Sequence, residues 1–216
     1  MAVITISRQF ASGGADVAKL IGQQLGWEVV DNEFVDLVAQ RSGVPKPEVE
    51  RLEERVPGLL ERLAQAMALA SPEVFVVTGE TPTTGPSTEE EIVRTTERII
   101  SEAVKHDNMI LVGRGAQSYL AQRDNVLHVF VVAPREVRVL RAMERLKVDR
   151  KEAERTVDDV DSGRRQYVKT HYGRGWDDPV NYHLVLNSER LSYSEIADLV
   201  VGVVRMRDWQ KSQVTK

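Results

Sequence analysis

The chain has 216 residues, a length that suits one globular domain or one domain with an insertion. Hydrophobic residues make up 42% and charged residues 29% of it, the balance of an ordinary globular protein. The formal net charge of −4 provides no overall basic field for nucleic acid, and the absence of cysteine excludes disulfides, thiolate metal sites and a cysteine nucleophile.

No apolar run reaches the roughly 18 residues that a membrane span needs. The N-terminus also lacks the basic and then apolar layout of a signal peptide. We therefore expect a cytoplasmic protein with no membrane partner and no nucleic-acid partner. The net negative charge does not exclude a small anionic ligand, because an acidic protein can still have a local basic site.

The N-terminal segment predicts a strand, a glycine-containing turn, a helix and a second strand. Ala2 to Ser7 is a short apolar run rich in β-branched residues, which is typical of a buried strand. Apolar residues recur at helical spacing from Val17 to Leu25, and Gly26 is a typical helix stop. Trp27 to Val30 predicts the second strand, which ends at Asp31.

Helical segments interrupted by prolines and glycines are expected from Glu33 to Ala70. Thr78 to Thr88 mixes prolines and glycines with threonines and predicts a mobile loop, after which a helix runs to about His106. The apolar face from Leu59 to Ala70 fits either a homo-oligomer interface or the core, and the core is the commoner of the two.

The remainder of the chain alternates strands with helices. The strand candidates are Met109 to Val112, Asn125 to Ala133 and His183 to Leu186. Helices are expected from Pro134 to about Lys147, from Asp149 to Lys169 and from Ser194 to about Trp209. Such alternation indicates parallel strand pairing. The prediction is an α/β fold, a three-layer α/β/α sandwich around a mainly parallel five-stranded sheet.

The turn between the first strand and the first helix is a candidate anion site. Its residues are Arg8-Gln9-Phe10-Ala11-Ser12-Gly13-Gly14. The N–H groups at the start of a helix are unpaired and lie at the positive end of the helix dipole, which suits a phosphate. Gly13 and Gly14 allow the backbone to approach that phosphate closely. A tight turn without a ligand is the alternative interpretation.

Arg114 is a second candidate, because it follows a predicted strand within Gly113-Arg114-Gly115. Ligands of open parallel sheets bind at the carboxyl ends of the strands. The planar guanidinium fork of arginine matches a phosphate group. A surface arginine on a glycine-rich turn is the alternative interpretation.

Two later segments also concentrate charge. Arg138, Arg141 and Arg145 are spaced i, i+3 and i+7 on one helix, a pattern that a solvated helix face also produces. Asp158-Asp159-Val160-Asp161-Ser162-Gly163-Arg164-Arg165 places acids before a pair of cations, as a polar helix end also does. The histidines at 106, 128, 171 and 183 have no metal-ligand spacing, and we interpret them as structural.

Several stretches together resemble the cytidylate kinase-like family, which belongs to the P-loop kinases of nucleoside monophosphates. The stretch ITISRQFASGGADVAKLIGQQLGWEVVD resembles the first strand, P-loop and helix of that family. The resemblance continues in the family's order through MILVGRGA, VFVVAPREVRVLRAMERL, VDDVDSGRRQYVKTHYG and YHLVLNSERLSYSEIADLV. It covers most of the chain, although each stretch alone is weakly specific.

The resemblance implies an ATP phosphate site in the first turn, formed by Arg8, Ser12, Gly13, Gly14, Ala15 and Asp16. The turn departs from the P-loop pattern, in which a lysine contacts the β- and γ-phosphates and a hydroxyl contacts Mg²⁺. Gly14 stands in the place of that lysine, Asp16 in the place of the threonine, and Arg8 in the place of the first glycine. We hypothesise that Arg8 replaces the missing charge and that Asp16 lies on the metal side.

The resemblance further implies that Arg114 contacts the acceptor phosphate and that Arg138 and Arg141 lie near the lid and the phosphates. Asp31 matches the start of the acceptor-binding segment. Val112 and Gly115 replace acidic residues of the family pattern. One of those acids helps to organise Mg²⁺ in the family, so we expect Mg²⁺ binding to differ from that pattern.

The stretch around residue 161 matches the family's lid. Arg164 matches a lid arginine, Arg165 is an adjacent substitute, and Asp161 matches the aspartate that contacts the base. Two further lid arginines fall on Val157 and Val160, so fewer cations surround the phosphates. Closure of such a lid excludes water and completes the site.

The resemblance therefore implies ATP-dependent phosphoryl transfer to a nucleoside monophosphate, with CMP or dCMP expected and Mg²⁺ bridging the donor phosphates. Within one domain spanning 1–216, residues 33–88 would form the acceptor-binding insertion and residues 149–174 the lid. No general base is needed, because phosphate is already a nucleophile. The alternative is a nucleotide-binding regulatory or interaction protein with the kinase fold and little or no catalytic activity.

Overall fold

The computed structural model describes residues 2–31, 93, 97, 100, 101, 104, 105 and 108–206. The helices and strands named below belong to one compact unit made of Met1–Asn32 and Ala103–Lys216. The strands are β1 (Val3–Arg8), β2 (Glu28–Asp31), β3 (Met109–Val112), β4 (Val126–Val132) and β5 (Leu184–Asn187). The helices are α1 (Gly14–Leu25), α6 (Ala116–Tyr119), α7 (Arg135–Leu146), α8 (Arg150–Tyr172) and α9 (Tyr193–Met206), with a 3-10 turn over Pro179–Asn181.

The five strands form one parallel sheet in the order β2-β3-β1-β4-β5. β1 is central: Ile4 pairs with Ile110 of β3 on one side and with Leu127 of β4 on the other. All six residues of β1 are buried, as expected for a parallel strand covered on both faces. The predicted parallel five-stranded sheet is therefore confirmed.

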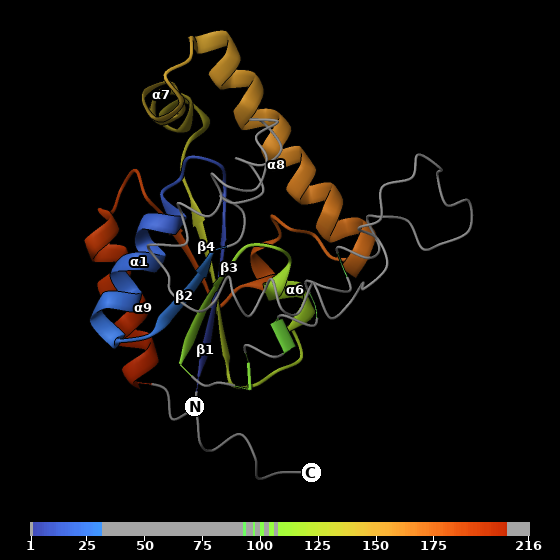
Figure 1. The fold of residues 1–216 in the computed structure, drawn as a ribbon, viewed down its shortest axis with the longest axis vertical. Helices are drawn as coiled ribbons and strands as arrows, with labels where there is room; N and C mark the ends of the chain where they lie inside the picture. The colour runs from blue at the N-terminus through green and yellow to red at the C-terminus, as the bar shows by residue number, and fades with distance from the viewer. Residues whose placement is uncertain are drawn as a thin grey trace, which may run out of the picture. The chain divides into compact units, whose positions relative to one another are not determined.

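Helices cover both faces of this sheet. α1 and α9 lie side by side on one face, where Val17, Ile21, Ile196 and Val200 are fully buried against the strands (Figure 1). On the other face, the C-terminal part of α8 packs on β4, with Val168 against Phe130. These are the two outer layers of the predicted α/β/α sandwich.

Element boundaries differ from the predictions by a few residues. β2 begins at Glu28 because the N–H of Trp27 bonds to the carbonyl of Gly22 and closes α1. β5 extends to Asn187, which pairs with Val132. α6 and the 3-10 turn were not predicted, because three or four residues are too few to show a helical period.

The polar helix predicted from Asp149 to Lys169 is present as α8, which has 23 residues. The Asp149 carboxylate accepts a hydrogen bond from the N–H of Glu152 and caps its start. The predictions over residues 33–88 lie outside the described residues, as do those for the apolar face over 59–70. The lid role of 149–174 and the insertion role of 33–88 stay predictions. Within the described part of the chain, no helix is long and apolar enough to cross a membrane.

Tyr182 lies in an aromatic cluster between β4 and α8. Its ring stacks on Phe130, with the ring centroids 4.8 Å apart, and its hydroxyl donates to the carbonyl of Trp176. Burial raises the pKa of Tyr182 to about 12. The folded protein therefore holds the phenol proton more tightly than the unfolded chain, whose tyrosines titrate near pH 10.

This raised pKa predicts a specific loss of stability in alkali. The contribution of Tyr182 is complete below about pH 10 and is lost as the pH rises toward about 12. Urea unfolding at several pH values should show a smaller decline above about pH 10 for Tyr182→Phe than for the wild type. Equal declines in both proteins would show that Tyr182 does not titrate in this way.

Candidate functional site

The ends of three neighbouring strands bring the main candidate residues together. β1 ends at Arg8, β2 ends at Asp31, and β3 is followed at once by Gly113. Because the three strands are parallel and adjacent, these ends meet at one edge of the sheet (Figure 1). Crevices at this edge are where open α/β sheets bind ligands.

Arg8 spans this edge from β1 to β2. Its side chain is only 8% exposed, and Nη2 donates to Oδ1 of Asp31 at 3.2 Å. The guanidinium passes directly over Gly113, where a Cβ atom would lie 1.8 Å from Nη1. A side chain at 113 would therefore displace Arg8. The charged group of Arg8 points across β3 toward β2, while its stem packs on Gly14.

Arg114 lies in an unusual turn after β3. Gly113, Arg114 and Gly115 have φ angles of +78°, +49° and +67°, so three successive residues are in the left-handed region. That conformation costs a non-glycine residue about 1 kcal/mol, and such positions are frequent at ligand sites. Gly115 is required for a second reason, because a Cβ atom there would lie 2.5 Å from the ring of Tyr172.

The β1–α1 loop, residues 9–13, leads into the N-terminus of α1. Gly13 has a φ of +84°, and a Cβ atom on it would lie 2.2 Å from the ring of Tyr193. Ser12 is fully buried, and its hydroxyl lies 2.8 Å from the carbonyl of Gln9 and 3.0 Å from that of Val131. The Ser12 hydroxyl therefore faces the protein interior.

The start of α1 offers backbone N–H groups and one carboxylate. Gly14 begins the helix, Ala15 is partly buried, and Asp16 is exposed in the first turn. Among the residues that the structure describes, no group of three or more histidines and acids is arranged to hold a metal ion. Asp16 is the acidic side chain in the first turn of α1.

Arg138 and Asp161 form a buried ion pair behind the loop. Nη1 of Arg138 lies 2.7 Å from Oδ2 of Asp161, and their side chains are 7% and 4% exposed. The other carboxylate oxygen of Asp161 accepts from the N–H of Phe10 at 2.8 Å, and Nη1 of Arg138 donates to the Phe10 carbonyl at 3.2 Å. The pair thus binds both backbone groups of Phe10.

The sequence did not predict that Arg138 and Asp161 would pair with each other. The roles of Arg138 at the phosphates and of Asp161 at a base stay predictions. In the structure both side chains bind each other and the backbone, and Nε of Arg138 donates to the carbonyl of Ala133 at 3.0 Å.

The two neighbouring arginines of α8 point in different directions. Arg164 is 13% exposed, and its Nη1 donates to the carbonyl of Arg8 at 2.6 Å, which places it at the end of β1. Arg165 is 49% exposed and pairs with Asp177 at 3.2 Å. Successive helical residues are rotated by about 100°, so only one of the two can face the sheet edge. Arg164 does so.

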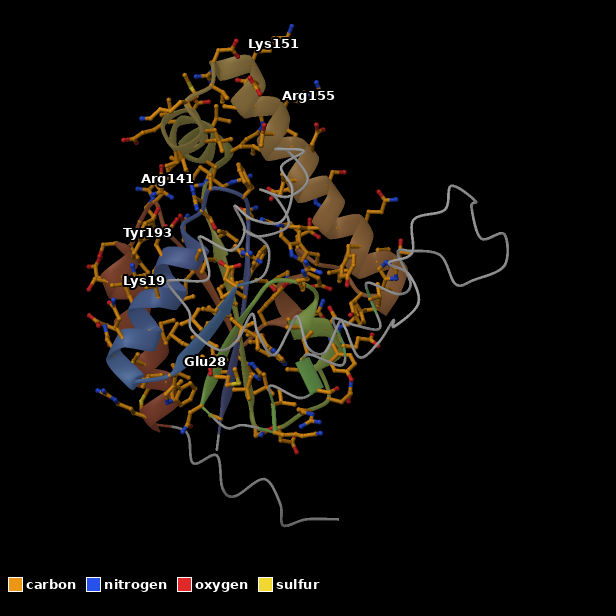
Figure 2. The ribbon with its side chains drawn as sticks, viewed as in Figure 1. Lys19, Glu28, Arg141, Lys151, Arg155 and Tyr193 are labelled. Atoms are coloured by element: carbon orange, nitrogen blue, oxygen red, sulfur yellow. The ribbon has the colours of Figure 1, made fainter. Side chains whose placement is uncertain are left out.

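Arg141 binds a residue that the sequence analysis missed. Its Nη1 and Nη2 donate to the hydroxyl and the carbonyl of Ser188, at 2.9 and 2.8 Å. Its guanidinium lies 5.5 Å from the ring centroid of Tyr193, and Figure 2 shows the two side chains as neighbours beside α1. Ser188 directly follows β5, so its position at a strand end was the one sequence signal that pointed to it.

The histidines in the described part of the chain have structural partners. Nδ1 of His128 lies 2.7 Å from the hydroxyl of Thr5, and the rings of His128 and His183 stack with centroids 5.2 Å apart. The ring of His171 packs against Tyr167. These contacts agree with the structural interpretation of the histidines.

Comparison with known proteins places this chain among kinase folds. The model of the cytidylate kinase-like family matches residues 3–190. An uncharacterized protein from Eubacterium ventriosum has a crystal structure with a TM-score of 0.67 at 18% identity, over 96% of this chain and 100% of that chain. No curated protein matches the chain.

Two further solved structures are similar at lower scores. Shikimate kinase from Acinetobacter baumannii in complex with shikimate has a TM-score of 0.50 at 11% identity, over 96% of this chain and 95% of that chain. The YorR protein from Bacillus subtilis in complex with phosphorylated GDP has a TM-score of 0.50 at 10% identity, over 95% and 96%. At these identities the likeness shows a shared fold alone.

Because this ion pair is buried, we expect that removing one partner destabilises the protein strongly, and that removing both partners adds little to that loss. Arg138→Met leaves the Asp161 carboxylate buried with fewer partners and should lower the free energy of unfolding by about 3–5 kcal/mol. Replacing both residues with apolar ones should cost less than the sum of the two single changes. Urea unfolding of the two single variants and the double variant measures this.

Arg135 and Asp158 provide the matched control. They join the same two helices with the same separation in sequence, but their side chains are 47% and 56% exposed. Arg135→Met should therefore destabilise the protein much less than Arg138→Met, because solvent screens an exposed ion pair. Equal losses for Arg135→Met and Arg138→Met would contradict the structural role of the buried pair.

Proposed function

Because this chain belongs to the cytidylate kinase-like family and has the fold of P-loop kinases, we propose that it transfers a phosphoryl group from ATP to a nucleoside monophosphate. CMP or dCMP is the proposed acceptor. One observation carries the proposal: Arg8, Asp31 and the Gly113–Gly115 turn meet at the sheet edge beside the β1–α1 loop.

The donor side of the proposed site is the start of α1. The backbone N–H groups of Gly13 and Gly14 lie at the positive end of a 12-residue helix, where they would bind the phosphates of ATP. Mg²⁺ would enter with ATP as part of the substrate. Asp16, exposed in the first turn, is the carboxylate that the chain offers to that ion or to its water ligands.

The acceptor side is the end of β2 and β3. Arg114 would bind the phosphate of the nucleoside monophosphate through its planar fork. Arg8 crosses to this side, and Asp31 fixes the position of its guanidinium. Arg164, bonded to the carbonyl of Arg8, adds a third cation from α8. We propose that these three arginines stabilise the negative charge of the transferring group.

The reaction then depends on the orientation of the two nucleotides more than on proton transfer by side chains. An oxygen of the acceptor phosphate attacks the γ-phosphorus of ATP, the bond from that phosphorus to the β–γ bridging oxygen breaks, and ADP leaves. The acceptor phosphate is already a nucleophile, so no general base is required. Cations held in fixed positions favour the transition state, because they need no reorganisation as charge develops.

The alternative proposal is a nucleotide-binding regulatory or interaction protein with little or no turnover. It is favoured by Gly14 in the place of the P-loop lysine and by Asp16 in the place of the threonine. Both differences remove groups that act on the phosphates and Mg²⁺ in P-loop kinases. Binding of MgATP without turnover on any acceptor would support this alternative.

The first test is ADP formation from MgATP with CMP, dCMP, UMP, AMP and GMP in turn. Turnover is expected with CMP or dCMP, and Arg114→Ala should lower kcat/KM by about 100-fold or more, the usual loss of a key transition-state contact. Arg155→Ala is the control, because Arg155 is 83% exposed on α8 and should be neutral (Figure 2). Absence of turnover with all five acceptors would contradict the kinase proposal.

A second test concerns the charge of Arg8. Arg8→Met keeps the apolar stem that packs on Gly14 but removes the cation. Turnover should fall by roughly tenfold or more, and Arg8→Lys should recover part of it, because a point charge replaces the fork. Unchanged nucleotide affinity and turnover in Arg8→Met, with the fold intact by circular dichroism, would refute a role of Arg8 in replacing the missing lysine.

A further inference from the structure

Hydrogen bonds hold Ser12 of the β1–α1 loop at its backbone and its side chain. It is fully buried, its N–H donates to the carbonyl of Gln9 at 3.2 Å, and its hydroxyl lies near two backbone carbonyls. Its own carbonyl accepts a hydrogen bond from the Ser188 hydroxyl at 2.7 Å. All three polar groups of Ser12 are therefore hydrogen-bonded. The group that Ser188 binds is the Ser12 carbonyl, which belongs to the peptide unit between Ser12 and Gly13.

That peptide unit controls the direction of the Gly13 N–H. The Ser12 carbonyl and the Gly13 N–H belong to one planar trans peptide, so they point in opposite directions. A carbonyl that is held toward Ser188 therefore directs the Gly13 N–H away from Ser188. The carbonyl of Gly13 accepts from the N–H of Val17 at 3.0 Å and belongs to the first turn of α1.

Arg141 in turn fixes the Ser188 hydroxyl. A guanidinium can only donate hydrogen bonds, so the Ser188 hydroxyl accepts from Nη1 of Arg141. The single hydrogen of that hydroxyl is then available for the Ser12 carbonyl. The second bond, from Nη2 of Arg141 to the Ser188 carbonyl, prevents rotation of the guanidinium. The hydrogen bonds therefore run in one donor-to-acceptor direction, from Arg141 on α7 to the Ser188 hydroxyl and from that hydroxyl to the Ser12 carbonyl.

Tyr193 also contacts the loop, at Gly13. Its ring lies so close to Gly13 that a Cβ atom there would be 2.2 Å away, and Arg141 lies over the same ring. Gly13 is therefore in contact with a rigid ring, and the peptide before it is bonded to Ser188. Figure 2 shows Arg141 and Tyr193 next to each other near the start of α1.

We propose that Arg141, Ser188 and Tyr193, here called the Ser188 cluster, set the orientation of the Ser12–Gly13 peptide. Arg141 is then a positioning residue that acts through Ser188, and it does not contact the transferred phosphate. The effect on ATP rests on the proposed function, in which the Gly13 N–H binds a donor phosphate. The effect on the peptide itself does not depend on any ligand.

A double-mutant cycle with Arg141→Met and Ser188→Ala tests the proposal. Each single variant should weaken MgATP binding in calorimetry by about tenfold, the usual effect of losing a hydrogen bond to a charged or buried group. Adding Arg141→Met to Ser188→Ala should change the affinity by less than about twofold, because the shared path is already broken. Multiplying losses would show that Arg141 acts on nucleotide binding independently of Ser188 and would overturn the proposal.

Two further variants control for nonspecific effects. Arg145→Met makes the same change one turn along α7 at an exposed position and should leave MgATP affinity unchanged. Ser188→Thr keeps the hydroxyl and should bind MgATP within about twofold of the wild type.

The backbone amide of Gly13 separates this proposal from the proposed function. In the protein without nucleotide, its NMR chemical shift and its hydrogen exchange should change in Arg141→Met and in Ser188→Ala but not in Arg145→Met. An unchanged Gly13 amide would overturn the role of the cluster, whatever the protein binds. If wild-type protein binds no MgATP but the amide responds as expected, the proposed function fails and the role of the cluster stands.

Discussion

The buried pair of Arg138 and Asp161 is the interaction on which the site depends. Two charges removed from water are stable only when nearly all their hydrogen-bonding capacity is used. Here that requirement is met by the N–H and carbonyl of Phe10 and by the carbonyl of Ala133. The need to satisfy the charges therefore fixes the entry of the β1–α1 loop against α7 and α8. Helix α8 and the candidate phosphate loop share one buried polar centre.

The loop is held from three directions by side chains of different elements. Asp161 and Arg138 bind it at Phe10, Ser188 binds it at Ser12, and Arg164 bonds to the carbonyl of Arg8 where β1 ends. Two of its residues, Ala11 and Gly13, have positive φ angles of 59° and 84°. Such conformations persist only where surrounding contacts determine them. A loop that lacks the P-loop lysine is thus held by bonds to its own backbone, which leaves its remaining N–H groups in defined directions.

The arginines show how tertiary contacts divide residues that look alike in sequence. Arg138 and Arg141 both lie on α7 at helical spacing, yet the first is buried on Asp161 and the second binds Ser188. Arg164 and Arg165 are adjacent, yet one reaches the end of β1 and the other faces solvent with Asp177. Arg8 carries its charge away from the loop to Asp31. Among the residues that the structure describes, the arginines at the carboxyl end of β1 and β3 are therefore Arg8, Arg164 and, on the turn after β3, Arg114.

The sequence by itself determined the parallel sheet and the edge at which the candidate residues gather. Buried parallel strands need continuous apolar runs, and those runs place Arg8, Asp31 and Gly113 at strand ends before any contact is known. Only the tertiary structure decided which polar groups bind each other. Phe10 and Asp161 are 151 positions apart, and Ser12 and Ser188 are 176 apart. Local periodicity indicates which face of a helix or strand is apolar. It does not indicate which distant residue becomes the hydrogen-bond partner of a polar side chain after folding.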